Sequence, residues 1–213
     1  MTTEKSLKQF SKLQNYKILK TAHELLVKQS INCFTYNSQI NGPIYNINSV
    51  NPINSNTLLE NFDKTHNCVS VILGPSDLMC ISIEVSDETI TNDVIDLLNK
   101  EETLKYFVKY EDKVNFFYLF KYSEELKKMS GTSFKFDNCI VEFMFNGSIM
   151  IPCSSFKNYE LKWINSSNLK PVDEVLILEL DITLSHTSHI KTKNDLGLTW
   201  YYKQKCKECK SLE

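Results

Sequence analysis

Hydrophobic residues between Leu7 and Gln29 recur at the spacing of one helix face, and Thr21–Lys28 has the pattern of an amphipathic helix. We therefore predict an N-terminal helix that packs on the elements after it. Ile31–Tyr36 is short and apolar, which predicts a β-strand. Gln39–Asn56 is rich in Asn, Pro and Ser and predicts a loop, which either holds a ligand or only connects its neighbours.

Two pairs of strand-like segments flank strong turn signals and predict β-hairpins. The first pair is Cys68–Leu73 and Leu78–Val85, around the turn Gly74-Pro75-Ser76-Asp77. The second pair is Phe136–Phe145 and Ser148–Pro152, around Asn146-Gly147, where both turn positions favour a positive φ.

The remaining periodic segments predict two helices and one more strand. Thr57–Asp63 predicts a short helix, Asp93–Leu104 a longer helix, and Lys113–Tyr122 an aromatic strand. Val172–Leu184 fits either a helix or a strand. No internal repeat is visible, so the pattern indicates an α+β fold in which helices cover one face of an antiparallel or mixed sheet.

Composition and charge are those of a folded globular protein. The chain is 42% hydrophobic and 23% charged, and we expect one domain over residues 1–185 followed by a polar tail, residues 186–213. A formal net charge of -2 provides no global positive field, so contact with nucleic acid requires a local basic patch. Neither a signal-peptide core nor a run of roughly 20 apolar residues is present, which predicts a soluble, intracellular protein, nuclear or cytoplasmic.

The seven cysteines lack a dense disulfide spacing, which predicts reduced thiols. In the tail, Cys206 and Cys209 form a single Cys-x-x-Cys, half of a tetrahedral zinc site. His186 and His189 could supply the other two ligands. The tail therefore holds either a partial zinc-binding element or free thiols.

Three segments stand in an order and spacing that carry a family resemblance: Asn67–Glu84 (NCVSVILGPSDLMCISIE), Lys113–Lys121 (KVNFFYLFK) and Val141–Phe156 (VEFMFNGSIMIPCSSF). They resemble, respectively, the opening Gly-Pro-Ser turn and metal-binding strand, the strand of the catalytic histidine, and the third motif of the primase-polymerase domain of the archaeo-eukaryotic primase superfamily. Tyr159 and Trp163, which have three residues between them, fall where that family often has a Tyr-x-Trp element. The resemblance implies a primase-polymerase-like fold with an RRM-like unit, and it extends to about Leu180.

The resemblance also implies a site for Mg²⁺ or Mn²⁺. Two-metal nucleotidyl transfer uses carboxylates that bridge the cations, and acids at positions i and i+2 of a strand share one face. Glu84 stands at the first of these positions, and Ser86 replaces the second acid. Asp87 can join only if the strand ends or bulges there. Glu142 is the third-motif acid, so we predict that Glu84 and Glu142 are the catalytic ligands and converge in one cleft from adjacent strands.

Two of the four expected catalytic groups are missing. The second acid is absent at Ser86, and the histidine position falls near Phe116 or Phe117, whose apolar rings cannot bind a triphosphate. Each loss of a group that acts on the transition state typically lowers the rate by about a hundredfold or more. The aromatic strand that contains these rings, Phe116 to Phe120, either stacks on bases or belongs to the core, and we expect the core.

Three functions follow from these residues. The first is a degenerate primase-polymerase-like domain that binds single-stranded DNA or template-primer, with replication proteins or a helicase as partners. The second is an active, divergent DNA primase or polymerase that uses Glu84 and Glu142 with Mg²⁺ or Mn²⁺. The third is a protein-interaction module without nucleic-acid binding, which the acidic pI of 6.1 favours.

Overall fold

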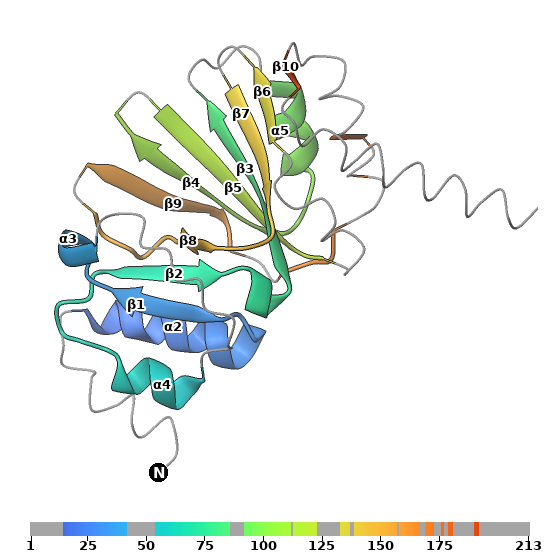
Figure 1. Cartoon of the computed structure of the whole chain (residues 1–213). Coiled ribbons are helices and arrows are strands. Elements are labelled where there is room, and N and C mark those ends of the chain that lie inside the picture. The colour runs from blue at the N-terminus through green and yellow to red at the C-terminus, as the bar shows by residue number, and fades with distance from the viewer. Residues whose placement is uncertain are drawn as a thin grey trace, which may run out of the picture.

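The computed structural model describes residues 15–41, 54–85, 92–111, 113–122, 133–136, 139–156, 158–166, 169–172, 176, 179–180 and 190–191. These residues form two antiparallel sheets and a few helices, which confirms the predicted α+β class (Figure 1). The small sheet has the strand order β1-β2-β8, and the large sheet has the order β10-β6-β7-β3-β5-β4-β9.

The elements have the following bounds. The helices are α2 (Tyr16–Gln29), α3 (Ser38–Asn41), α4 (Ser55–Glu60), the 3-10 helix η1 (Gly74–Ser76) and α5 (Asn92–Asn99). The small sheet contains β1 (Cys33–Tyr36), β2 (Cys68–Ile72) and β8 (Ser148–Met150). The large sheet contains β3 (Leu78–Val85), β4 (Leu104–Tyr110), β5 (Lys113–Lys121), β6 (Ser133–Phe136), β7 (Cys139–Met144), β9 (Tyr159–Asn165) and β10 (Ile190–Lys191).

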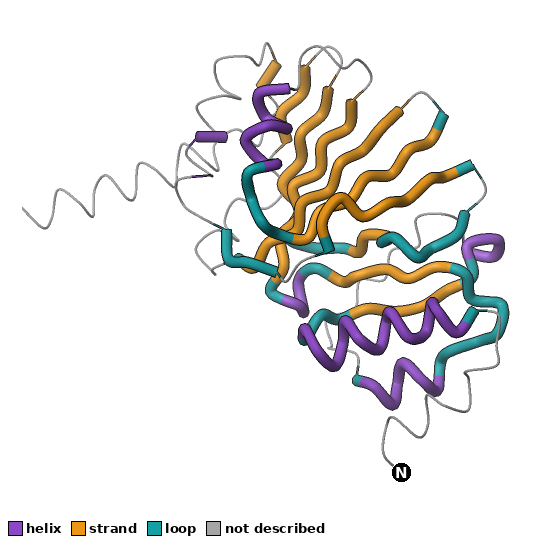
Figure 2. The backbone as a smooth tube through the Cα atoms, turned by 180° about the vertical axis from the view of Figure 1, so that it is seen from behind, coloured by secondary structure: helices purple, strands orange, loops and turns teal. Residues whose placement is uncertain are grey.

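Helix α2 covers the side of the small sheet that faces away from the large sheet, and α4 lies against α2 (Figures 1 and 2). Its apolar stripe, which includes Leu19 and Ala22, packs with Val69 and Val71 of β2 in one buried cluster. The helix ends at Gln29 because Ser30 adopts the left-handed conformation, with φ of 56°. The amphipathic helix and the strand after it were therefore predicted correctly from Thr21 to Tyr36.

The two faces of the large sheet have different coverings. Alternate residues of β3, such as Ile81 and Ile83, pack with Val94 and Leu98 of α5 in one core cluster. The intervening residues of β3 face the small sheet, and Cys80 joins the cluster that extends to α2. The polar positions further along this second face, Ser82 and Glu84, are only partly buried.

Both predicted hairpins are wrong, although their strands exist. β2 and β3 belong to different sheets, and so do β7 and β8. The turn signals mark the two places where the chain crosses between sheets, and these crossovers touch: the Leu73 amide donates to the Gly147 carbonyl at 3.0 Å. A Cβ on Gly74 would lie 3.1 Å from Asn146 Oδ1, so glycine permits this close approach.

Other boundaries also differ from the prediction. The helix predicted over Asp93–Leu104 ends at Asn99, and Leu104 begins β4, a strand that the sequence analysis missed. Phe136 belongs to β6, which pairs with β7 in the true hairpin. The predicted loop Gln39–Asn56 contains the end of α3 and the start of α4. Residues 42–53 and nearly all of the tail lie outside the described residues.

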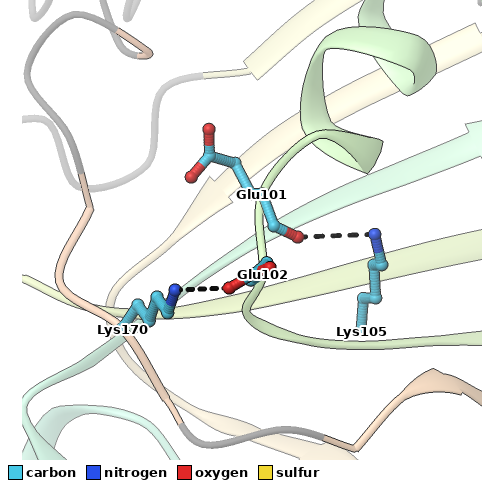
Figure 3. A network of polar contacts seen from close by, with 4 residues as sticks. All are labelled: Glu101, Glu102, Lys105 and Lys170. Carbon is cyan, nitrogen blue, oxygen red and sulfur yellow. Dashed lines mark hydrogen bonds and ion pairs between the residues drawn. The ribbon is translucent and has the colours of Figure 1, made fainter.

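The connection from α5 to β4 is held by a buried lysine. Lys105 is only 7% exposed, and its ammonium donates to the Asn99 carbonyl at 2.8 Å. It also donates to the Glu101 carbonyl at 3.4 Å (Figure 3). It thus satisfies carbonyl groups at the C-terminal end of the helix, where a positive charge is favourable. The neighbouring ion pair, Lys170 to Glu102 at 2.7 Å, is exposed (Figure 3).

Candidate functional site

A cavity of about 270 Å³ lies between the two sheets. Five strands of the large sheet line it, with Ser82, Glu84, Asn115, Phe117, Glu142 and Tyr159 among their contributions. The small sheet supplies the other wall with Ser70, Ser148 and Met150. The two walls are joined by a hydrogen bond from the Tyr106 hydroxyl on β4 to the Met150 carbonyl on β8, at 2.7 Å.

The two predicted acids reach this cavity from adjacent strands. In the antiparallel pairing of β3 with β7, Ser82 lies opposite Glu142 and Glu84 lies opposite Ile140. All four residues share one face, because cross-strand partners and residues two apart point the same way. Glu84 and Glu142 are thus diagonal neighbours, for which strand geometry gives a spacing of about 7–8 Å. The predicted convergence in one cleft is confirmed, and the catalytic and ligand roles of the two side chains stay predictions.

An ion pair ties one of these acids to the start of β5. Lys113 Nζ lies 2.8 Å from Glu84 Oε1, and the two side chains are 55% and 33% exposed. Glu142 is exposed to solvent. The ammonium group of Lys113 therefore offsets the charge of Glu84, and a cation that binds Glu84 has to compete with it.

The cavity also contains neutral oxygen atoms. Asn115 pairs with Glu84 across β5 and β3, and its side-chain oxygen is buried without a hydrogen-bond partner. Buried acceptors are nearly always paired in proteins, so this atom suits a ligand that supplies a cation or a donor. Carboxylate, amide and hydroxyl oxygens are the ligands that Mg²⁺ and Mn²⁺ prefer. The donor set of Glu84, Glu142, Asn115 and Ser82 therefore fits such a cation.

The aromatic strand β5 divides its rings between the two faces. Phe117 lines the cavity and stacks on Tyr106, with ring centroids 4.9 Å apart and planes 10° apart. Tyr118 and Phe120 are fully buried in the core on the other face, as predicted, and Phe116 packs there too. Of Phe116 and Phe117, the two rings near which the resemblance implied a histidine, only Phe117 lines the cavity.

Several predicted ligands lie outside the described residues: Asp87, His186, His189, Cys206 and Cys209. Their proposed roles at a divalent-cation or zinc site stay predictions. Within the described part of the chain, no group of three or more His, Cys, Asp or Glu side chains is placed so that it could hold a metal ion. The cavity therefore combines two carboxylates with neutral oxygens.

Sequence reasoning missed Ser82 and Asn115, and it missed the contact of Lys113 with Glu84. The signal for the first two residues was available. Ser82 stands two positions before Glu84 in an apolar strand, and Asn115 is the polar residue that alternates with Phe117 in an aromatic strand. The contact of Lys113 with Glu84 depends on the pairing of β3 with β5, which the predicted hairpins did not contain.

Comparison with known proteins does not assign the chain to a family. No family model matches it, and a search of curated proteins finds no match. No helix in the described part of the chain is long and apolar enough to cross a membrane.

Proposed function

We propose that the chain is a primase-polymerase-like domain that binds nucleic acid with one divalent cation and has lost most nucleotidyl-transfer activity. One observation carries this proposal. Glu84 and Glu142, each from a segment that resembles a metal-binding motif, face one cavity on adjacent strands. The two segments lie far apart in the sequence. That both contribute an acid to one cavity is therefore a specific expectation of the resemblance.

The donor set supports one cation more readily than two. Two-metal phosphoryl transfer needs carboxylates that bridge the cations, and the described cavity supplies two, of which Glu84 is paired with Lys113. Glu84 and Glu142 would hold Mg²⁺ or Mn²⁺, with Asn115 Oδ1 as a neutral ligand. A bound cation would neutralise phosphate charge. The large sheet would supply the groups that bind the cation, and the small sheet forms the other wall of the cavity.

Two features support the proposed loss of catalysis: the apolar ring of Phe117 and the presence of only two carboxylates in the described cavity. Phe117 stacks on Tyr106 where the resemblance implies a histidine, and its ring offers no donor to a triphosphate. Loss of a single donor to the transition state typically lowers kcat by about 10² to 10³. Binding of phosphate and cation needs fewer groups and can persist when the chemistry is lost.

The test is Mn²⁺ binding by titration calorimetry to the wild type, Glu84→Gln and Glu142→Gln. Glu160→Gln serves as the matched control, because Glu160 is an exposed glutamate on the opposite face of β9. We expect at least a tenfold loss of affinity in both cavity variants and none in the control. Equal Mn²⁺ affinity in all four proteins would contradict the proposal.

The same convergence of Glu84 and Glu142 supports a second candidate, an active, divergent primase or polymerase. It differs in one measurable outcome, because it predicts primer synthesis or extension with Mg²⁺ or Mn²⁺ that disappears in Glu142→Gln. Absence of product at high enzyme concentration, together with Glu-dependent Mn²⁺ binding, favours the degenerate domain.

A further inference from the structure

An outer row of side chains continues the cavity to the edge of the large sheet. The register of β9, β4 and β5 places Tyr159 opposite Tyr110, and Tyr110 opposite Lys113. Directly paired residues share a face, so these three lie on the cavity side. Asn115 and Glu84 form the next row, one two-residue step away. Tyr159 also lines the cavity itself, which makes the two rows continuous.

The rings of this outer row are stacked and partly exposed. The Tyr110 and Tyr159 centroids lie 4.4 Å apart with planes at 15°, and Phe156 contacts Tyr159 at 4.9 Å. All three side chains are partly accessible to solvent. Further inside the same face, Tyr106 is fully buried and serves the core. Tyr106 is thus enclosed by the core, whereas the outer rings keep part of their surface open to a ligand.

We propose that Tyr110, Tyr159 and Lys113 form a binding platform for one single strand of nucleic acid, in which bases stack on the rings and a phosphate pairs with Lys113. This inference rests on the proposed function and names the partner of the same site. Aromatic side chains bind every base through its π-face, and a lysine ammonium supplies the charge for the backbone. The aromatic pair and the cation stand side by side in one row, so a base on the rings and a neighbouring backbone phosphate on Lys113 can bind at the same time.

The ion pair of Lys113 links the platform to the cavity. A phosphate that binds Lys113 takes the place of the Glu84 carboxylate, now 2.8 Å from the ammonium. Glu84 would then be available to hold a cation, so binding of the strand and binding of the cation would strengthen each other. The acidic groups around the site and the overall charge of -2 keep the affinity for the nucleic-acid strand low. They also make this affinity depend only weakly on the salt concentration.

The platform is tested by fluorescence anisotropy of a labelled oligo(dT) with the full chain. We expect Tyr110→Leu and Tyr159→Leu to bind roughly 5- to 150-fold more weakly, the range that one stacked base supplies. Tyr110→Phe keeps the ring and should bind like the wild type. Ile164→Ala is the matched control, since Ile164 is 45% exposed on the opposite face of β9. Lys113→Gln should reduce the slope of log affinity against log salt by about one.

A second measurement avoids dependence on variants that fold poorly. An oligonucleotide with 5-iodouracil is photocrosslinked to the wild type, and we expect adducts on Tyr110, Tyr159 or Phe156. Adducts confined to other residues, unchanged affinity in both Leu variants, or no oligonucleotide binding at all would each overturn the platform.

These outcomes separate the platform from the proposed function. If Mn²⁺ binding requires Glu84 and Glu142 but oligonucleotide binding ignores the rings, only the platform fails. If Mn²⁺ binding is independent of both glutamates while the rings still control oligonucleotide affinity, the proposed function fails and the platform stands.

Discussion

Ser82 on β3 lies directly opposite Glu142 on β7, and Glu84 follows two residues later on the same face. A hydroxyl therefore lies next to two carboxylates in the lining of the cavity, at a position where an acid would complete a three-carboxylate cluster. The family resemblance implies a second acid at Ser86, whereas the strand register makes Ser82 an equally favourable position for one.

Replacing this hydroxyl by a carboxylate should strengthen cation binding. We expect Ser82→Asp to raise the Mn²⁺ affinity by about tenfold, because cation affinity increases with the number of charged oxygen ligands. Ser82→Asn, of the same size and without charge, is the control and should leave the affinity within about twofold of the wild type. Calorimetric titration at pH 7 decides the matter, and equal affinities for the two variants would show that the cation does not bind beside residue 82.

Removing the competing ammonium should also strengthen cation binding. Exposed ion pairs contribute up to about 1 kcal/mol, and loss of the repulsion between ammonium and cation adds to this. We therefore expect Lys113→Gln to raise the Mn²⁺ affinity roughly three- to tenfold at low salt, with a smaller effect at high salt. Lys121→Gln, at the other end of β5, provides the control in the same titrations. A lower affinity in Lys113→Gln than in the control would contradict competition at Glu84.

The strands of this fold were largely predictable, and their partners were not. The period-2 alternation of β3 and β5 is intrinsic to each segment, so the sequence reveals it. The turns at Gly74 and Gly147 have the composition of hairpin turns, yet Leu73 and Gly147 are paired with each other across the two crossovers. Which sheet a strand enters depends on contacts between distant segments, and local sequence does not encode those.

β4 was missed because its polar residues are explained only by the folded structure. Lys105 and Lys109 interrupt the apolar run of this strand, and a buried lysine is rare unless its ammonium is satisfied. The Asn99 carbonyl that satisfies Lys105 becomes available only after α5 has ended. Similarly, Glu84 and Glu142 were found through their charges, whereas Asn115 became visible through its unpaired buried oxygen.

The lysine at the end of α5 should matter for stability rather than for nucleic-acid binding. Lys105→Met keeps most of the apolar stem but leaves the Asn99 carbonyl without its donor, which costs about 1–3 kcal/mol. Lys170→Met removes an exposed ion pair with Glu102 and should cost less than about 1 kcal/mol. Urea unfolding of both variants measures the difference. Equal stability of the two proteins would mean that water replaces the ammonium at no cost.

Stability should fall at alkaline pH because buried thiols resist ionisation. Burial is the main cause that raises the pKa of Cys33 from 9.0 to about 12 and the pKa of Cys153 to about 11. Above pH 9 the unfolded chain releases these protons while the folded chain retains them. The stabilisation is therefore complete below pH 9 and is lost as the pH rises toward 11 and 12, with a slope approaching about 1.4 kcal/mol per pH unit for each thiol.

Urea unfolding at pH 8, 9 and 10 with a reductant present measures this slope. Cys33→Ala removes one of the titrating groups, so its free energy of unfolding should decline less steeply between pH 9 and 10, by up to about 1.4 kcal/mol. Its stability at pH 8 will be lower than that of the wild type, because the Cys33 thiol fills the core and donates to the Ala22 carbonyl at 3.0 Å. Comparing slopes rather than absolute values removes that effect. Parallel declines in the two proteins would show that Cys33 ionises alike in the folded and unfolded states.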